Sequence, residues 1–239
     1  MAKVLLAQAA KVSANVFREG VEFSVKKRAL AVGGQLISFQ GVHSEISDIF
    51  LPLYGDHQAN NAAVALAAVE VFTKVKLDDE LVREAFSKVK SPGRCEIVYK
   101  DPLVIIDAGH NPHGISALAK TINSEFDFES VIAVVGVLAD KDVNGMLKEL
   151  VEMADFIVIT QNQSPRAMPS DELAAIASSY FKSEQIEVMP DLKLALRFAL
   201  EKATLANQVS DGVSAVVVTG SVLTAGEARG ILREFGEKI

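Results

Sequence analysis

The second half of the chain alternates between short apolar runs and stretches with helical periodicity. The apolar runs are rich in Val and Ile and predict strands buried on both faces, at 103–107, 131–136, 155–160, 185–189 and 213–219. Helical patterns separate them, near 113–123, 143–153, 170–181, 191–205 and 225–236. Alternation of strand and helix at this spacing is typical of a parallel, doubly wound sheet, so we expect a Rossmann-like α/β domain.

Polar residues at the helix starts support this reading. Ser170 precedes two acidic residues, Asp191 follows a proline, and the segment 224–227 reads as a capping box.

The first 90 residues follow a different pattern. Alternating or β-branched runs predict short strands at 21–25, 35–40 and 48–53, with a glycine turn before the second. Helices are expected at 55–72 and 78–89, where alanine is frequent. Three short strands with no core before them indicate the end of a larger domain.

The break at Ser91-Pro92-Gly93 separates these two patterns. We therefore expect two domains, covering 1–90 and 91–239.

Composition narrows the classes of function. The net charge of −7 argues against a nucleic-acid-binding face, and no apolar run is long enough to span a membrane. A single cysteine, Cys95, excludes an internal disulfide framework and fits a reducing compartment. We expect a cytoplasmic protein without nucleic-acid or membrane partners.

The segment from Asp107 to Pro112 is the strongest candidate for chemistry. It follows a predicted buried strand and leads into a helix, with Asn111 suited to the N-cap and Pro112 to the first turn. Asp107 and His110 thus lie where α/β sheets bind ligands, beside a helix N-terminus that favours anions. The alternative is a well-capped turn carrying an ordinary exposed histidine.

Further polar residues follow other strands. Lys141 follows the second predicted strand of this domain and could meet a phosphate or a carboxylate; Ser221 follows the last. Arg94 is a candidate phosphate ligand because a guanidinium is always charged and can bind bidentately, although it also reads as an ordinary linker arginine. His57, His110 and His113 lack metal-ligand spacing, so we expect no metal ligands from the chain.

Known phosphate-binding fingerprints are absent from the sequence. It contains neither Gly-x-Gly-x-x-Gly after a strand nor Gly-x-x-x-x-Gly-Lys-Ser/Thr. A nicotinamide-dependent oxidoreductase is therefore disfavoured, and the chain has no complete phosphate cradle of its own.

Several motifs occur in an order that resembles one family. The segments are 55–63, 91–96, 107–112, 136–142 and 218–221. They resemble the C-terminal half of folylpolyglutamate synthase/dihydrofolate synthase, within the Mur ligase superfamily. One departure is local: Ala108 and Gly109 are exchanged relative to the family's more frequent Asp-Gly-Ala-His-Asn-Pro.

The resemblance implies a Mur ligase C-terminal domain at 91–239, preceded by a remnant of the central ATPase domain at 1–90. Family members are about twice as long, and their N-terminal P-loop domain binds most of the ATP, the Mg²⁺ and the folate. They join L-glutamate to folates or to dihydropteroate through an acyl phosphate. We expect the chain to be a monomer and, lacking a P-loop, to be inactive alone.

The resemblance also assigns roles to nucleotide-binding residues. Asn61 is expected to contact the nucleotide near its base, and Arg94 to approach the phosphates. Asp107 is expected to hydrogen-bond the ribose or to order the linker between the domains.

The substrate-binding roles fall on the other strand ends. His110 resembles the family histidine near the incoming glutamate and the phosphoryl group, and is the expected catalytic residue. Ser221 is expected to help hold the glutamate, and Lys141 is a further candidate for the same anionic region.

Other functions remain open at this stage. One is a Mur-type ligase that adds an amino acid to a cell-wall precursor. The other is a non-catalytic module that binds nucleotides.

Overall fold

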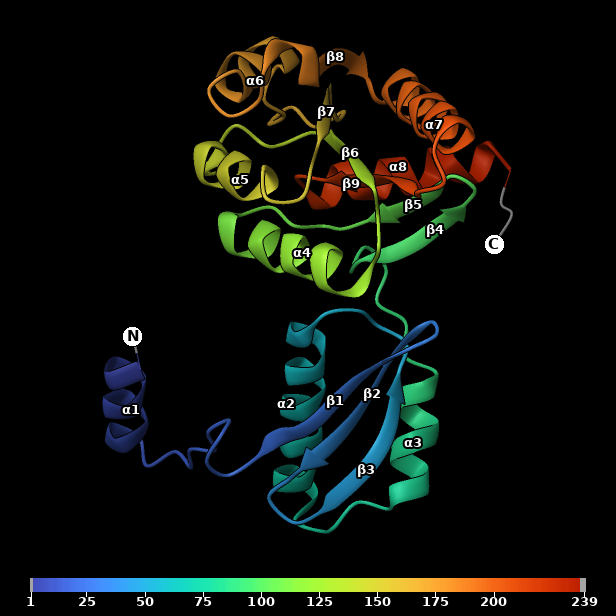
Figure 1. Ribbon diagram of the computed structural model, residues 1–239. Coiled ribbons are helices and arrows are strands. Elements are labelled where there is room, and N and C mark those ends of the chain that lie inside the picture. The colour runs from blue at the N-terminus through green and yellow to red at the C-terminus, as the bar shows by residue number, and fades with distance from the viewer. Residues whose placement is uncertain (1, 237–239) are drawn as a thin grey trace. The chain divides into compact units, whose positions relative to one another are not determined.

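The computed structural model describes residues 2–236, which divide into two compact units at the junction between Lys90 and Ser91. Each unit has its own sheet (Figure 1). Each also has its own hydrophobic core. We describe the two units separately.

The first unit is a three-stranded antiparallel sheet, in the order β1-β2-β3, covered by helices. Its elements are α1 (Ala2–Lys11), β1 (Ser24–Ala31), β2 (Gly34–Gln40), β3 (Glu45–Leu51), α2 (Asp56–Thr73) and α3 (Asp79–Ser87). Phe39 and Ile49 of the sheet are fully buried beside Ala63 and Leu66 of α2 in one core. The small alanines of α2 bring its backbone close to the sheet. Helix α1 has no buried residue.

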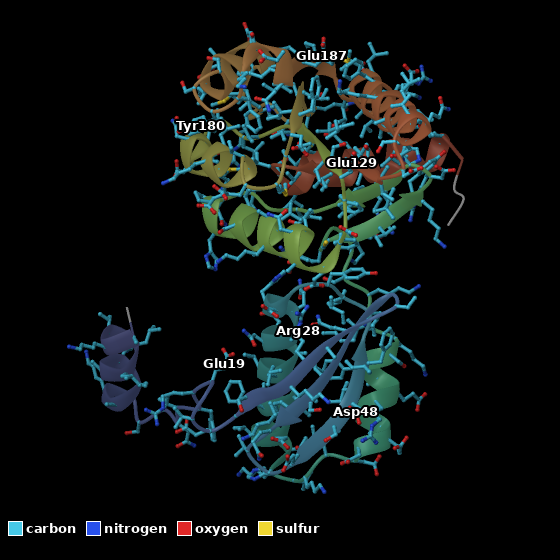
Figure 2. The ribbon with its side chains drawn as sticks, viewed as in Figure 1. Glu19, Arg28, Asp48, Glu129, Tyr180 and Glu187 are labelled. Atoms are coloured by element: carbon cyan, nitrogen blue, oxygen red, sulfur yellow. The ribbon has the colours of Figure 1, made fainter. Side chains whose placement is uncertain are left out.

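Hydrogen bonds and an ion pair hold the loops of this unit. The buried carboxylate of Glu70 on α2 accepts hydrogen bonds from the backbone N–H groups of Val42 (2.7 Å) and His43 (3.3 Å). Arg28 on β1, labelled in Figure 2, forms an ion pair with Asp56 (2.8 Å) at the start of α2. A buried charge needs such partners to offset its loss of water.

The first strand begins later than predicted. We expected a strand at 21–25, but β1 starts at Ser24, because Val21 and Glu22 donate backbone hydrogen bonds to Arg18 O and close a turn.

The second unit is a six-stranded sheet with helices on both faces. Its elements are β4 (Glu96–Lys100), β5 (Leu103–Ile106), α4 (Pro112–Glu125), β6 (Ser130–Val135), α5 (Val143–Leu150), β7 (Phe156–Gln161), α6 (Ser170–Ala177), the 3₁₀ turn η1 (Ser183–Gln185), β8 (Ile186–Asp191), α7 (Leu192–Val209), β9 (Ser214–Thr219) and α8 (Val222–Glu234). The strand order is β4-β5-β9-β6-β7-β8, and every neighbouring pair except β4-β5 is parallel.

The helices divide between the two faces of this sheet. Helices α7 and α8 pack on one face, over a core that includes Val216 and Val218 of β9, and α4, α5 and α6 cover the other (Figure 1). Tyr180, just after α6 and labelled in Figure 2, donates a hydrogen bond to Asn144 on α5 (3.1 Å). The predicted doubly wound, mostly parallel α/β fold is confirmed.

The strand order places the last strand, β9, between β5 and β6. The chain leaves β9 towards α8 on one face, whereas it leaves β5 and β6 towards α4 and α5 on the other. Loops that part in this way form the topological switch point at which α/β sheets bind ligands.

Three local predictions need correction. The antiparallel edge strand β4 was not predicted, because its apolar run is only three residues long and lies between charged residues at both ends. Helix α8 begins at Val222 with Ser221 as its N-cap, whereas we expected it to begin at about residue 225 with Thr224 as its cap. Ser170 is the first residue of α6 and gives no cap hydrogen bond, because Pro169 occupies the N-cap position.

No helix within residues 2–236 is both apolar enough and long enough to cross a lipid bilayer.

Candidate functional site

The loops after β5, β9 and β6 are joined at the carboxyl edge of the six-stranded sheet. Gly220 N donates to Gly109 O (3.1 Å), and Gly136 N donates to Thr219 O (3.3 Å). Gly220 has φ +106°, and a Cβ there would lie 2.7 Å from Gly136 O. This position requires glycine, both for its backbone conformation and for its space.

Asp107 joins the segment before β4 to the loop after β5. Its carboxylate is buried and accepts hydrogen bonds from Cys95 N (2.9 Å) and Gly109 N (2.7 Å). A backbone bond from Ala108 N to Gly93 O (2.8 Å) runs beside them. Residues 93–95 therefore lie alongside residues 107–109, although they are twelve positions apart in the sequence.

Arg94 lies within this joined segment, with its side chain exposed. Its guanidinium forms no hydrogen bond or ion pair with any residue in the part of the chain that the structure describes. Arg94 carries a permanent positive charge, and Asp107 holds the backbone of its segment. The guanidinium remains available to an anion.

The neighbouring Cys95 is not a nucleophile. Burial raises the pKa of its thiol, and the carboxylates of Asp107 and Glu125 raise it further. The thiol stays protonated and packs as an apolar group.

His110 follows directly after the segment held by Asp107. Its side chain is half-buried, and its Nδ1 lies 3.0 Å from Ala108 O. A carbonyl oxygen only accepts, so Nδ1 carries the proton and Nε2 remains the second hydrogen-bonding atom of the ring. Asn111 then caps α4 by accepting from Gly114 N (2.8 Å), and Pro112 begins the helix.

Lys141 lies in the loop after β6, with its side chain half-buried. Its Nζ is 3.7 Å from Asp140 Oδ2, which also receives a hydrogen bond from Arg166 (2.7 Å). The Arg166 guanidinium, and secondarily Lys141, lowers the pKa of Asp140. Ala139 N bonds Arg166 O (2.9 Å), which fixes this loop against the one after β7.

Ser221 is buried, and its hydroxyl faces the interior of the protein. Its Oγ accepts from Thr224 N (2.9 Å), which caps α8, and from Asn162 Nδ2 (3.3 Å). The sequence did not reveal Asn162, which is buried and lies 59 positions away. A polar residue directly after the carboxyl end of β7 was the only local signal.

Asn61 belongs to the first unit. It is exposed on α2, and its Nδ2 donates to Gln58 Oε1 (3.3 Å).

The structure thus brings together Arg94, Asp107 and His110, with Lys141 and Ser221 on the loops of neighbouring strands. Within residues 2–236, no group of three or more His, Cys, Asp or Glu side chains is arranged to hold a metal ion.

Comparison with known proteins gives a consistent result. Residues 93–226 match the family model described as Mur ligase, glutamate ligase domain. The chain is 44% identical to the dihydrofolate synthase/folylpolyglutamate synthase of Mycobacterium tuberculosis over 237 residues, which is 95% of the chain and 49% of that protein.

Solved structures agree with the sequence comparison. The chain matches Mycobacterium tuberculosis folylpolyglutamate synthase complexed with ADP at a TM-score of 0.94, with 44% identity, covering 96% of this chain and 52% of that one. It also matches a bifunctional folylpolyglutamate synthase/dihydrofolate synthase with Mn, AMPPNP and L-glutamate bound, at 0.75 and 28% identity, covering 97% and 51%. The chain spans about half the length of the curated relatives it matches. The predicted family resemblance is confirmed.

Proposed function

The chain belongs to the Mur ligase family through its glutamate ligase domain, and on that premise we propose that it forms the glutamate-adding part of an ATP-dependent folylpolyglutamate synthase/dihydrofolate synthase. The proposal covers the addition of L-glutamate to folates, to dihydropteroate, or to both. The names of its relatives support this substrate class over a cell-wall precursor.

We propose that Arg94 meets the phosphates of the nucleotide. A guanidinium without a partner among residues 2–236 is well suited to this role, because it can bind phosphate oxygens bidentately. When bound, ATP activates the acceptor carboxylate as an acyl phosphate, and cationic groups offset the charge that develops on the transferred phosphoryl group.

The residues of the second unit fit part of a nucleotide site and not a metal site. Arg94 supplies charge for phosphate, whereas the described residues offer no cluster of metal ligands. The sequence also lacks a P-loop. We therefore expect ligation only from the complete protein, with Mg²⁺ and most of the ATP held by other parts of it.

Asn61 of the first unit and Asp107 of the second each have a proposed role of their own. Asn61 is proposed to contact the nucleotide near its base. Both carboxylate oxygens of Asp107 accept backbone N–H groups, which supports a role in ordering the linker more than a direct contact with the ribose.

The glutamate side of the reaction is assigned to His110, Lys141 and Ser221. The free Nε2 of His110 can accept a proton from the attacking amine, and Lys141 can attract a carboxylate. The Ser221 hydroxyl is engaged in capping α8, so we propose that Ser221 acts by fixing that turn.

A single observation carries the proposal: the Asp107 carboxylate bonds the backbone on both sides of the site, next to Arg94 and next to His110. The backbone that carries a cation and a proton acceptor is thereby held at the switch point of the sheet. A ligase that transfers a phosphoryl group and then accepts a proton needs this combination.

The test is Arg94→Ala in the complete protein, assayed by ATP-dependent incorporation of L-glutamate. We expect kcat/KM for ATP to fall by about two orders of magnitude or more, because a charge-assisted contact to phosphate is lost. The melting temperature should stay unchanged, since the side chain is exposed. Arg197→Ala, which removes an exposed arginine stacked on Phe235 of the same unit, is the matched control. Near-normal activity of Arg94→Ala contradicts the assignment.

A nucleotide-binding module without catalysis would give a different result. It would bind ATP in calorimetry but incorporate no glutamate in the complete protein.

A further inference from the structure

A buried polar network lies beneath the loops that carry Lys141 and Ser221. It consists of Asn162, Ser221, Thr224 and the backbone carbonyl of Gly136, and we refer to it as the Thr224 network. Thr224 Oγ1 lies 2.7 Å from Gly136 O, 3.0 Å from Asn162 Nδ2 and 2.9 Å from Ser221 Oγ. Thr224 is fully buried, Ser221 is 1% exposed and Asn162 is 2% exposed.

The donors and acceptors of the network allow one consistent assignment. The Gly136 carbonyl can only accept, so the Thr224 hydroxyl proton points to it. Thr224 Oγ1 then accepts from Asn162 and from the Ser221 hydroxyl. Ser221 Oγ in turn accepts from Thr224 N and Asn162 Nδ2. Each hydroxyl donates once and accepts twice, so the network is saturated.

The network connects the ends of three strands. Gly136 follows β6 and opens the loop to Lys141, Asn162 follows β7, and Thr224 lies in the first turn of α8 after β9. Asn162 also accepts from Ser164 N (3.1 Å), which holds the loop after β7. The hydroxyl of Thr224 is the only side-chain group among the described residues bonded to Gly136 O.

We propose that Thr224 is a positioning residue for glutamate binding, which acts by fixing the 136–142 loop and its Lys141 relative to the start of α8. The assignment rests on the proposed function. Thr224 does not touch the substrate: it is buried, and it acts through the backbone of Gly136.

The backbone at Gly136 packs closely against Thr224, and the Thr224 hydroxyl bonds the Gly136 carbonyl at this contact. A Cβ on Gly136 would lie 2.9 Å from Thr224 Oγ1, so the two segments are already in close approach. Replacing the hydroxyl with a methyl group removes the side-chain donor to the Gly136 carbonyl, and it removes the acceptor for the Ser221 hydroxyl and for one N–H of Asn162. The loop must move to recover these bonds. The displacement changes where Lys141 points but leaves the Arg94 and Asp107 segments in place.

The experiment compares Thr224→Val, Thr224→Ser and Thr121→Val in the complete protein. Thr121 is 2% exposed and donates to Ala117 O of its own helix (2.8 Å), so its valine variant removes a buried hydroxyl without releasing a loop. Steady-state kinetics give KM for L-glutamate, KM for ATP and kcat.

We expect Thr224→Val to raise KM for L-glutamate about fivefold, which corresponds to one lost hydrogen bond. KM for ATP should stay within about twofold, a change too small to represent a lost hydrogen bond. Thr224→Ser should restore the wild-type KM for L-glutamate, and Thr121→Val should leave it unchanged. An equal effect on both substrates, an unchanged KM for L-glutamate, or a failure of the serine variant to restore it overturns the assignment.

Amide hydrogen exchange on the 239-residue chain tests the structural step separately. Faster exchange at 137–142 is expected in Thr224→Val and not in Thr121→Val, and unchanged exchange in both overturns the step. If the wild-type complete protein adds no glutamate, the proposed function fails and the assignment of Thr224 fails with it. If the wild type is active and only the glutamate KM prediction fails, the proposed function stands.

Discussion

The two edges of the six-stranded sheet are both held by polar side chains, but in different ways. At the amino-terminal edge, the exposed Asp155 accepts from Val131 N (2.9 Å) and Ser130 bonds Ser214 (2.7 Å). Glu129, labelled in Figure 2, lies just before β6 at this edge, and its N–H donates to Val213 O (2.9 Å). These bonds end strands and connect neighbouring segments.

At the carboxyl edge, most of the hydrogen-bonding side chains that connect the loops are buried. Asp107, Asn162, Ser221 and Thr224 are all buried, and their bonds to Cys95 N, to Gly136 O and to one another connect separate loops. Arg94 stays exposed above them. A buried hydrogen bond fixes a loop without occupying its outer surface, which leaves that surface available to a ligand. The carboxyl edge is therefore held mainly by buried side chains, whereas the amino-terminal edge is held by the exposed Asp155 as well as by the buried Ser214.

The largest expected effect comes from disturbing the carboxyl edge at Gly220. Gly220→Ala adds a Cβ 2.7 Å from Gly136 O at a φ of +106°, so both sterics and backbone strain oppose it. We expect the unfolding free energy of the second unit to fall by about 2–4 kcal/mol. Urea denaturation of the 239-residue chain measures it.

The control is Gly230→Ala on the exposed side of α8, where a Cβ meets nothing within 4 Å. Alanine favours a helix over glycine, so this variant should gain about 0.5–1 kcal/mol. Equal stability of the two variants would mean that the carboxyl-edge loops are less closely packed than the structure has them.

A smaller effect is expected at the amino-terminal edge. Asp155→Ala removes the acceptor for Val131 N, and we expect a loss of about 1 kcal/mol in unfolding free energy. Glutamate incorporation by the complete protein should not change. Asp127→Ala, an exposed aspartate in the loop before β6, is the control. Loss of activity in Asp155→Ala would contradict the division of roles between the edges.

The smallest effect is expected from Arg166→Ala. Its hydrogen bond to Asp140 is exposed and lowers the pKa of that carboxyl, so the variant should raise the pKa towards the ordinary value of 3.8. Because the pKa is lowered in the folded state, the interaction stabilises that state at pH values above the ordinary pKa of the carboxyl. This stabilisation is lost as the pH falls through the pKa of the folded state. Titration of the Asp140 carboxyl by NMR in both proteins measures the shift, and identical titration curves would contradict it.

The parallel sheet could be predicted from the sequence because its strands are short, apolar and evenly spaced. The strands β5, β6, β7 and β9 are buried at nearly every residue, so each reads as an unbroken apolar run. The edge strand β4 carries charged residues at both ends, and local pattern alone does not separate such a segment from a loop.

The sequence did not predict hydrogen bonds at the site between residues that are distant along the chain. Asp107 was identified from its place after a strand, but its bond to Cys95 N depends on how two segments fold together. The start of α8 shows the same limit. Both Ser221 and Thr224 are acceptable N-caps from sequence, and the choice follows from the bond between Thr224 and Gly136, 88 positions away.

The position of β9 has a consequence for synthesis. Because this strand follows both β5 and β6 in the sequence yet lies between them, a chain emerging from the ribosome cannot pair those two strands with their final neighbour until residue 219 is available. Until then β5 and β6 each expose an apolar edge that can pair with other chains. The centre of the sheet is thus completed only after β9 has been made, and protection of the nascent chain matters most before that point.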